Sequence, residues 1–146
     1  MKIHQISVFL ENKPGRLSAL CLALANAGIN ILALSLADTS QFGVLRLIVA
    51  DWEKARQVLE KAGCAVNVTQ VVAVGVEDKP GGLANVLEPI EKAGINLEYM
   101  YAFAFRAGGE AALVLCFADP DAAIEALRAK GCRVLDHVEL LDRAKA

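Results

Sequence analysis

One stretch of this chain occurs twice, and the repeat limits the possible folds more than any other feature. Residues 11–15 read Glu-Asn-Lys-Pro-Gly and residues 28–30 read Gly-Ile-Asn. Sixty-six positions later, residues 77–81 read Glu-Asp-Lys-Pro-Gly and residues 94–96 again read Gly-Ile-Asn. A repeat at a fixed offset predicts a duplicated structural unit.

The length fits two small domains. The chain has 146 residues, and the offset divides it into domain 1 at residues 1–69 and domain 2 at residues 70–146. Domains of about seventy residues bury little apolar surface alone, so we expect the two to pack against each other.

The composition is that of a globular protein without a strongly charged surface. Hydrophobic residues make up 55% of the chain, charged residues make up 22%, and the net charge is −2. Nucleic-acid binding requires a basic surface, so we expect no nucleic-acid partner.

An uncharged run at residues 17–36 is long enough to span a membrane, but the repeat argues against that interpretation. The corresponding residues 83–102 contain Pro89 and several charged side chains. The first residues of the chain also lack the basic and apolar segments of a signal peptide. We therefore expect a cytoplasmic protein with no membrane partner.

The four cysteines predict neither a metal site nor a disulfide framework. No pair has Cys-x-x-Cys spacing, and the chain has only two histidines to add as ligands. Cys21 and Cys116 align with apolar residues of the other copy, which indicates core positions. Cys64 and Cys132 align with each other, so a disulfide between them stays open, although we expect free thiols in a reducing cytoplasm.

Each copy predicts the order strand, helix, strand, strand, helix, strand. Apolar residues alternate in the strands and recur every three to four residues in the helices, Asp51 and Asp119 open the second helix of each copy, and a glycine follows each helix. The first copy predicts strands at 4–10, 30–38, 44–50 and 66–69 and helices at 14–27 and 51–62. The second copy predicts strands at 70–77, 96–105, 111–118 and 133–140, helices at 80–93 and 120–130, and a frayed tail at 141–146.

This element order predicts an α+β fold class. Two βαβ units joined by a hairpin form a ferredoxin-like βαββαβ unit, with an antiparallel sheet and both helices on one face. We expect two such units, packed as a pseudo-dimer within one chain. Residues 64–78 contain no proline and no turn cluster, so we expect this segment to bridge the two sheets, with or without exchange of an edge strand.

The sequence offers no catalytic constellation. His4 and His137 have no counterpart in the other copy, no serine or cysteine occupies a nucleophile elbow, and no carboxylate pair recurs at helical spacing. The glycine pairs at 81–82 and 108–109 lack the spacing of a nucleotide-binding loop. We therefore expect no enzyme activity, no metal and no cofactor.

The turn between the first strand and the first helix of each copy can bind an anion. Backbone N–H groups at a helix start are partly unpaired and the helix dipole is positive there, so a carboxylate can be held without a basic side chain. The alternative is a structural cap, in which Asn12 and Asp78 satisfy the first helical turn and nothing binds. The turn residues alone leave both readings open.

Asn30 and Asn96 stand at the start of the second strand in each copy, where valine or isoleucine is more usual. The side-chain amide offers both a donor and an acceptor. This suits a ligand with an ammonium and a carboxylate on neighbouring atoms, although a shared fold can also keep the residue for shape.

The motif Asn-Lys-Pro-Gly-x-Leu, followed by a helix and Ala-Gly-Ile-Asn-Ile, resembles the ACT domain, a regulatory module that binds amino acids. The resemblance covers residues 3–140, with Asp78 in place of the motif asparagine in the second copy. It implies that two domains pair side by side through their second strands and hold free amino acids between them. Asn12 and Gly15 would then face Asn96, while Gly81 and Asp78 would face Asn30.

The residues implied to bind ligand are Leu10, Asn12, Pro14, Gly15, Asn30 and Ile31 in the first copy, and Val76, Asp78, Pro80, Gly81, Asn96 and Leu97 in the second. Leu10 and Val76 depart from family members that have a polar residue there, which implies fewer side-chain contacts or a different ligand. Asp78 pairs with an ammonium better than Asn12 does, so we expect two non-equivalent sites.

The second strand of copy two carries an aromatic row. Tyr99, Tyr101, Phe103 and Phe105 alternate where the first copy has small residues. They can pack in the sheet, form a wall for a ligand side chain, or form a hydrophobic dimer face.

These observations together predict a non-catalytic, homodimeric regulatory protein. It would bind a small free amino acid at the interface of its two ACT-like domains and act in trans on an enzyme or regulator of amino-acid metabolism. The alternative is a protein–protein interaction module or regulatory subunit that needs no ligand.

Overall fold

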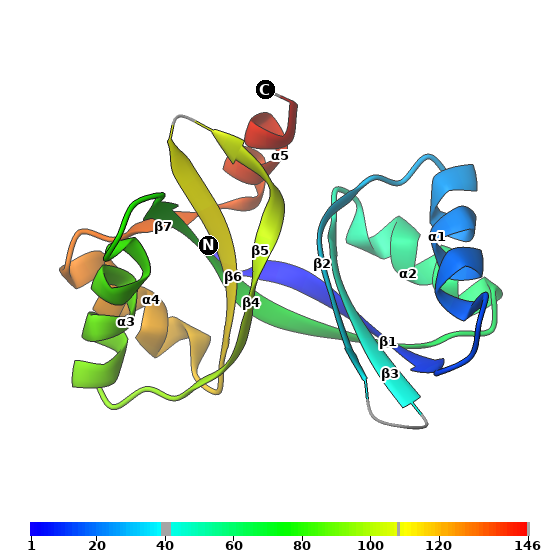
Figure 1. The fold of residues 1–146 in the computed structure, drawn as a ribbon, viewed down its shortest axis with the longest axis horizontal. Helices are drawn as coiled ribbons and strands as arrows, with labels where there is room; N and C mark the ends of the chain where they lie inside the picture. The colour runs from blue at the N-terminus through cyan, green and yellow to red at the C-terminus, as the bar shows by residue number, and fades with distance from the viewer. Residues whose placement is uncertain (39–41, 108, 146) are drawn as a thin grey trace. The chain divides into compact units, whose positions relative to one another are not determined.

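The computed structural model describes residues 1–38, 42–107 and 109–145 and divides into two compact units (Figure 1). The first unit is His4–Thr69, and the second unit is Gln70–Ala146 together with Met1–Ile3. Strands and helices alternate along the chain, as predicted for an α+β protein.

The first unit contains β1 (Ile3–Glu11), α1 (Arg16–Asn26), β2 (Ile31–Asp38), β3 (Phe42–Val49) and α2 (Trp52–Lys61). β3 lies between β1 and β2 and is antiparallel to both. Alternate residues of β1 and β3 pack against apolar residues of the two helices to form the core, which includes Ile6, Leu24, Leu45, Leu47 and Leu59.

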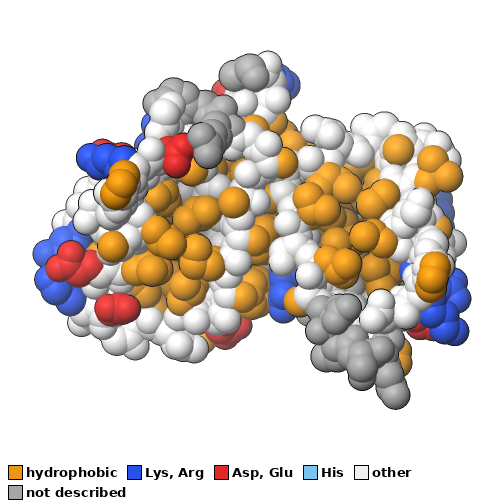
Figure 2. Space-filling model, in the orientation of Figure 1, with side chains coloured by type: hydrophobic (Ala, Val, Ile, Leu, Met, Phe, Trp, Pro, Cys, Tyr) orange, Lys and Arg blue, Asp and Glu red, His pale blue; other side chains and the backbone are white. Residues whose placement is uncertain are grey.

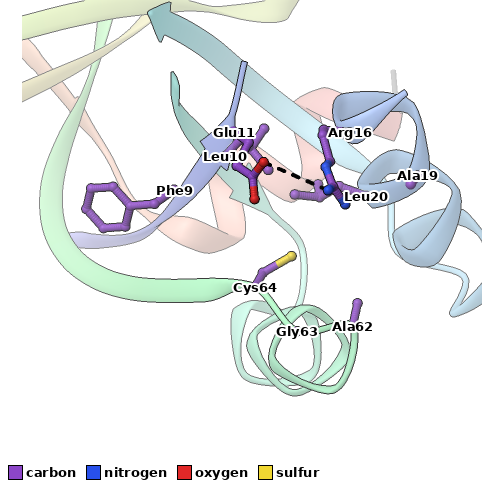
Figure 3. Close-up of a pocket in the computed structure, with 9 residues that line it drawn as sticks. All are labelled: Phe9, Leu10, Glu11, Arg16, Ala19, Leu20, Ala62, Gly63 and Cys64. Atoms are coloured by element: carbon purple, nitrogen blue, oxygen red, sulfur yellow. Dashed lines mark ion pairs between the residues drawn. The ribbon is translucent and has the colours of Figure 1, made fainter. Parts of the chain in front are cut away.

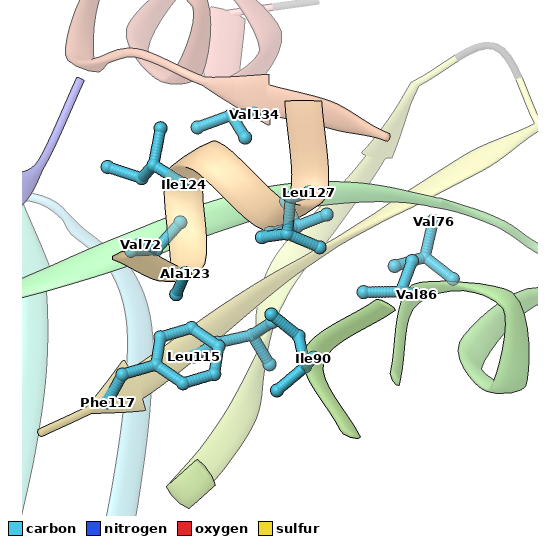
Figure 4. Close-up of a cluster of buried hydrophobic side chains, with 11 residues drawn as sticks. Val72, Val76, Val86, Ile90, Leu115, Phe117, Ala123, Ile124, Leu127 and Val134 are labelled. Carbon is cyan, nitrogen blue, oxygen red and sulfur yellow. The ribbon is translucent and has the colours of Figure 1, made fainter. Parts of the chain in front are cut away.

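The second unit contains α3 (Gly82–Lys92), β5 (Leu97–Ala107), β6 (Glu110–Phe117), α4 (Pro120–Ala129), β7 (Arg133–Leu135) and α5 (His137–Lys145). Its strands are paired in the order β5-β6-β4-β7, and the β5–β6, β6–β4 and β4–β7 pairs are antiparallel. The core lies between this sheet and helices α3 and α4 (Figure 4), with Val74, Ile90, Leu115 and Leu127 among its members.

β4 is one continuous strand, Ala65–Glu77, where the sequence predicts two strands in succession. The boundary between the two units falls inside it, at Thr69 and Gln70. A strand can continue here because the segment has no proline, no glycine or asparagine next to Thr69 and Gln70, and several valines, which favour extended backbone.

Helices α1 and α3 begin at Arg16 and Gly82, two residues later than predicted. Gly15 and Gly81 have φ of 86°, in the left-handed region, and therefore cannot belong to a right-handed helix. Pro14 and Pro80 consequently lie in the preceding turn.

The C-terminal prediction is wrong: residues 133–140 are not one strand, and the tail is helical. β7 ends at Leu135, and α5 follows. The amide of Glu139 donates to Asp136 Oδ1 at 2.9 Å, and the amide of Asp136 donates to Glu139 Oε2 at 3.2 Å. This reciprocal pair is a capping box. Leu140 is fully buried and secures the helix on the unit.

All four cysteines are free thiols, so Cys64 and Cys132 form no disulfide. Within the described ranges, no helix is long and apolar enough to cross a membrane. The uncharged run at 17–36 is divided between α1, a turn and β2.

Candidate functional site

The four helices of the repeat begin in two different ways. Asp51 Oδ1 accepts the amide of Lys54, and Asp119 Oδ1 accepts the amide of Ala122, both at 3.1 Å. These bonds cap α2 and α4, as the aspartates predict. At α1 and α3 the N-cap residues are Gly15 and Gly81, which have no side chain to accept such a bond.

Asn12 and Asp78 lie three residues before these glycines, so neither occupies the N-cap position that Asp51 and Asp119 occupy. The first amides of any α-helix lack partners within the helix. At α1 and α3 no N-cap side chain accepts them. Gly15 and Gly81 are exposed, so a small molecule can approach both positions.

The turns before α1 and α3 are built alike. The amide of Lys13 donates to the Glu11 carbonyl oxygen at 2.9 Å, and Lys79 makes the same bond to Glu77. Lys13 Nζ lies 3.0 Å from the Glu11 carboxylate, and Lys79 Nζ lies 2.6 Å from that of Glu77.

These ion pairs give the turn lysines an acidic partner within the turn itself. The hydrogen bond from Lys13 and the charges of Lys13 and Arg16 lower the pKa of Glu11 below its usual value. Glu11 therefore stays ionised at neutral pH. Backbone amides at a helix start can also hold an anion.

A hollow lies beside each turn. In the second unit it measures about 470 Å³, and we call it the α3 hollow. Its lining contains three predicted site residues, Val76, Asp78 and Pro80. Apolar side chains of α3, β5 and β6 complete it, namely Leu83, Met100 and Leu113.

The equivalent hollow in the first unit, the α1 hollow, measures only about 60 Å³. Its lining contains the predicted residues Leu10 and Asn12, together with Arg16, Leu17 and Leu36. The two copies therefore share the turn but differ in the space beside it. In the view of Figure 2, hydrophobic side chains gather over the β5 and β6 side of the second unit and over β2 of the first.

A second pair of hollows lies where the start of the first helix meets the end of the second helix in each unit. In the first unit, Leu10, Arg16, Leu20 and Cys64 line a space of about 210 Å³ (Figure 3). In the second unit the equivalent space measures about 270 Å³ and includes Cys132. Burial raises the pKa of both thiols, so neither is a ready nucleophile at neutral pH.

Asn30 and Asn96 lie at the opposite end of their own unit from the turn. Ile31, at the start of β2, pairs with Val49 at the end of β3, whereas Glu11, at the end of β1, pairs with Phe42 at the start of β3. The helix α1 runs from the turn toward Asn30, and its 11 residues span about 16 Å at 1.5 Å per residue.

The second unit repeats this separation. Leu97 pairs with Phe117, and Glu77 pairs with Glu110, at opposite ends of β6. Both asparagines are exposed, while Ile31 and Leu97 are half-buried strand residues. No unit can therefore bring its own asparagine and its own turn to one small ligand.

Two positions beside the α1 and α3 hollows differ between the copies and were not among the predicted site residues. Leu36 lines the α1 hollow, whereas its counterpart Ala102 pairs with Leu113 beside the α3 hollow. Arg16 corresponds to Gly82, where an added Cβ would overlap the carbonyl oxygen of Glu77. Alignment of the two copies contained this signal, because both positions differ strongly in volume.

The aromatic row has mixed surroundings. Phe103 is buried, and its ring centroid lies 5.3 Å from that of Phe105. Tyr99 and Tyr101 are half-buried. Met100 packs on the core formed with α3 and α4, so the alternating aromatic residues from 99 to 103 point to the other face of β5. None of the four lines the α1 or α3 hollow.

Across the described residues, no group of three or more histidine, cysteine, aspartate or glutamate side chains is arranged to hold a metal ion. The turns themselves offer backbone amides, an asparagine or aspartate side chain, a lysine–glutamate ion pair and apolar walls.

A family model described as an ACT domain pair matches residues 1–143. The chain belongs to this family. The predicted resemblance to the ACT domain is thereby confirmed for both copies.

Solved structures resemble this ACT domain pair over nearly its whole length. Protein BT0572 from Bacteroides thetaiotaomicron is 39% identical, with a TM-score of 0.90 and 96% of each chain covered. The ligand-free regulatory subunit of aspartate kinase from Thermus thermophilus is 18% identical, with a TM-score of 0.64 over 87% of this chain and 91% of that one.

The regulatory subunit of aspartate kinase from Thermus flavus is 20% identical, with a TM-score of 0.60 over 90% of this chain and 94% of that one. At these identities the two aspartate kinase subunits share the fold of the ACT domain pair. None of the curated proteins matches the chain.

Proposed function

We propose that this ACT domain pair is a non-catalytic regulatory protein that binds a small free amino acid between its two domains. It acts in trans on an enzyme or regulator of amino-acid metabolism. In this proposal each domain is a ferredoxin-like unit, and the two domains work as a pseudo-dimer within the chain.

The observation that carries the proposal is the contrast among helix starts. α2 and α4 are capped by aspartates, whereas the N-cap residues of α1 and α3 are glycines. The amides and the positive end of the helix dipole at a helix start favour a carboxylate. Both ACT turns keep this arrangement despite their different neighbouring residues.

The proposed ligand contacts combine the turn of one domain with the asparagine of another. The amides at Gly15 and the side chain of Asn12 act with Asn96, and the amides at Gly81 and the side chain of Asp78 act with Asn30. The placement of each asparagine far from its own turn supports a composite site, because a single domain cannot supply both groups.

The relatives support regulation in trans. Two structural neighbours are named as regulatory subunits of aspartate kinase, and this chain covers more than nine-tenths of each. We extend the proposal to a homodimer, which would give a partner two equal surfaces. A cytoplasmic setting agrees with the four free thiols.

A ligand panel tests the proposed function. Thermal unfolding of the full chain is measured with each of the twenty amino acids, and saturable stabilisation by one or a few is expected. The double variants Asn12→Ala/Asn96→Ala and Asp78→Ala/Asn30→Ala each alter one of the two proposed paired sites. At least one of them should lose a binding event in calorimetry while its melting temperature without ligand stays near that of the wild type.

Two results would contradict this proposal. Unchanged affinity and stoichiometry in both double variants would exclude the paired site. A panel in which no amino acid shifts the unfolding temperature would favour the ligand-independent interaction module instead.

A further inference from the structure

We propose that the α3 hollow receives the side chain of the bound amino acid, and that the α1 hollow receives none. The ligand is then an amino acid with a sizeable apolar side chain, bound once per chain. This inference rests on the proposed function, because it specifies the ligand of the same turns.

The α3 hollow and the α1 hollow differ in volume. Ligand pockets in proteins measure roughly 300–1,000 Å³, and the α3 hollow, at about 470 Å³, falls within that range. The α1 hollow measures about 60 Å³, which is room for only a few water molecules. The backbones of the two turns make the same hydrogen bond, so the volume beside each turn, together with Asp78 in place of Asn12, separates their ligands.

The walls of the α3 hollow away from the turn are apolar. Val76 and Leu113 come from the sheet, Met100 from its β5 strand, and Leu83 from α3, where it stays 38% exposed. A polar side chain placed here would lose hydration without gaining hydrogen-bond partners on these walls. An aliphatic or aromatic side chain would cover them and gain burial instead.

The charged groups of the α3 hollow lie on one side, at the turn. Asp78 is an acidic residue at this rim, and Lys79 is held 2.6 Å from the Glu77 carboxylate. A zwitterion can therefore place its carboxylate at the amides of Gly81 and its ammonium toward Asp78. Its side chain then points along the apolar walls.

The two hollows differ in size because the two copies have different side chains at equivalent positions. Leu36 stands in the first copy where Ala102 stands in the second, at equivalent register positions opposite Leu45 and Leu113. Leu36 brings four side-chain carbons to the α1 hollow, whereas Ala102 has a single methyl group and is not part of the lining of the α3 hollow. The geometry assigns Ala102 as the residue that keeps the α3 hollow open.

The Arg16 position adds to the same effect. Arg16 lines the α1 hollow and lies 3.9 Å from the Glu11 carboxylate. Its counterpart Gly82 has no side chain, and the close carbonyl oxygen of Glu77 leaves no space for one. The second copy therefore cannot regain a bulky side chain at this position without opening its turn.

Calorimetry on the full chain tests the proposal with glycine, serine, aspartate, lysine, valine, leucine, methionine and phenylalanine. We expect one apolar amino acid bound per chain. Ala102→Leu should weaken that binding by at least about tenfold, the lower end of the effect of one methylene group in an apolar pocket. Leu22→Ala, at an exposed position on α1 outside both hollows, is the matched control and should bind normally.

A second variant keeps the test decisive if Ala102→Leu folds poorly. Leu36→Ala enlarges the α1 hollow and should add a second, weaker binding event for the same amino acid. Three results would each overturn this inference while leaving the proposed function intact. They are preferential binding of glycine, serine or a charged amino acid, two equal sites in the wild type, and full affinity in Ala102→Leu. No binding of any amino acid would instead remove the proposed function itself.

Discussion

Replacement of Glu110 by alanine should release α5 from the second unit. Glu110 Oε2 accepts a hydrogen bond from Arg143 Nη2 of α5 at 2.5 Å and one from Arg133 Nη1 at 3.4 Å. The carboxylate lies over Gly75, where an added Cβ would overlap it. One acidic side chain therefore joins β6, β7 and the C-terminal helix.

The expected cost follows from the exposure of each partner. The side chain of Arg143 is 11% exposed and that of Glu110 is 21% exposed, so loss of this charged hydrogen bond should cost about 2 kcal/mol. Arg133 is 56% exposed, and its contribution should stay below about 1 kcal/mol. The free energy that holds α5 closed should then fall by about 2–3 kcal/mol.

Hydrogen exchange measured by mass spectrometry follows α5 separately from the rest of the chain. A loss of about 2–3 kcal/mol corresponds to exchange that is about 30- to 140-fold faster in residues 137–145. Glu88→Ala is the matched control, because its ion pair with Lys92 is exposed on both sides and should contribute less than about 0.5 kcal/mol. Unchanged exchange in α5, or an equal increase in α1, would refute the reasoning.

Two further predictions concern the turns and the thiols. Gly82→Ala should destabilise the protein by about 1–3 kcal/mol in urea unfolding, because the new methyl group overlaps the Glu77 carbonyl oxygen. Arg16→Ala at the equivalent position should cost far less. Equal losses of unfolding free energy in the two variants would contradict this. Cys132 should react with iodoacetamide more slowly than a free thiol at neutral pH, because burial raises its pKa and lowers the thiolate fraction. Mass spectrometry over a pH series checks this, and a rate equal to that of free cysteine at neutral pH would show the thiol to be accessible and ionised.

Local signals in the sequence predicted most of the secondary structure correctly. Asp51 and Asp119 cap their helices because the side chain and the amide that it accepts are three residues apart. Gly28 and Gly131 end helices because a residue without a Cβ can take a positive φ. These effects act within one turn of backbone, so a chain read from left to right contains them.

The repeat misled the prediction at the C-terminus. The first copy continues into β4, and the same continuation was expected for residues 133–140 of the second. The signature of a capping box, Asp136 followed by Glu139, was present in the sequence. This signal covers only four residues. The helix is also held by the burial of Leu140 and by the bond between Arg143 and the Glu110 carboxylate, which is distant in the sequence.

The sequence alone determined that this chain is a duplicated ACT protein, because a motif and its spacing survive in the linear order of residues. Only the tertiary structure decided that Gly15 and Gly81 are the N-cap residues of α1 and α3 and that each asparagine lies at the far end of its own unit. It also decided that one hollow is several times larger than the other. Those properties depend on which strands pair and on which side chains meet across the sheet, and such contacts join residues that are far apart in the chain.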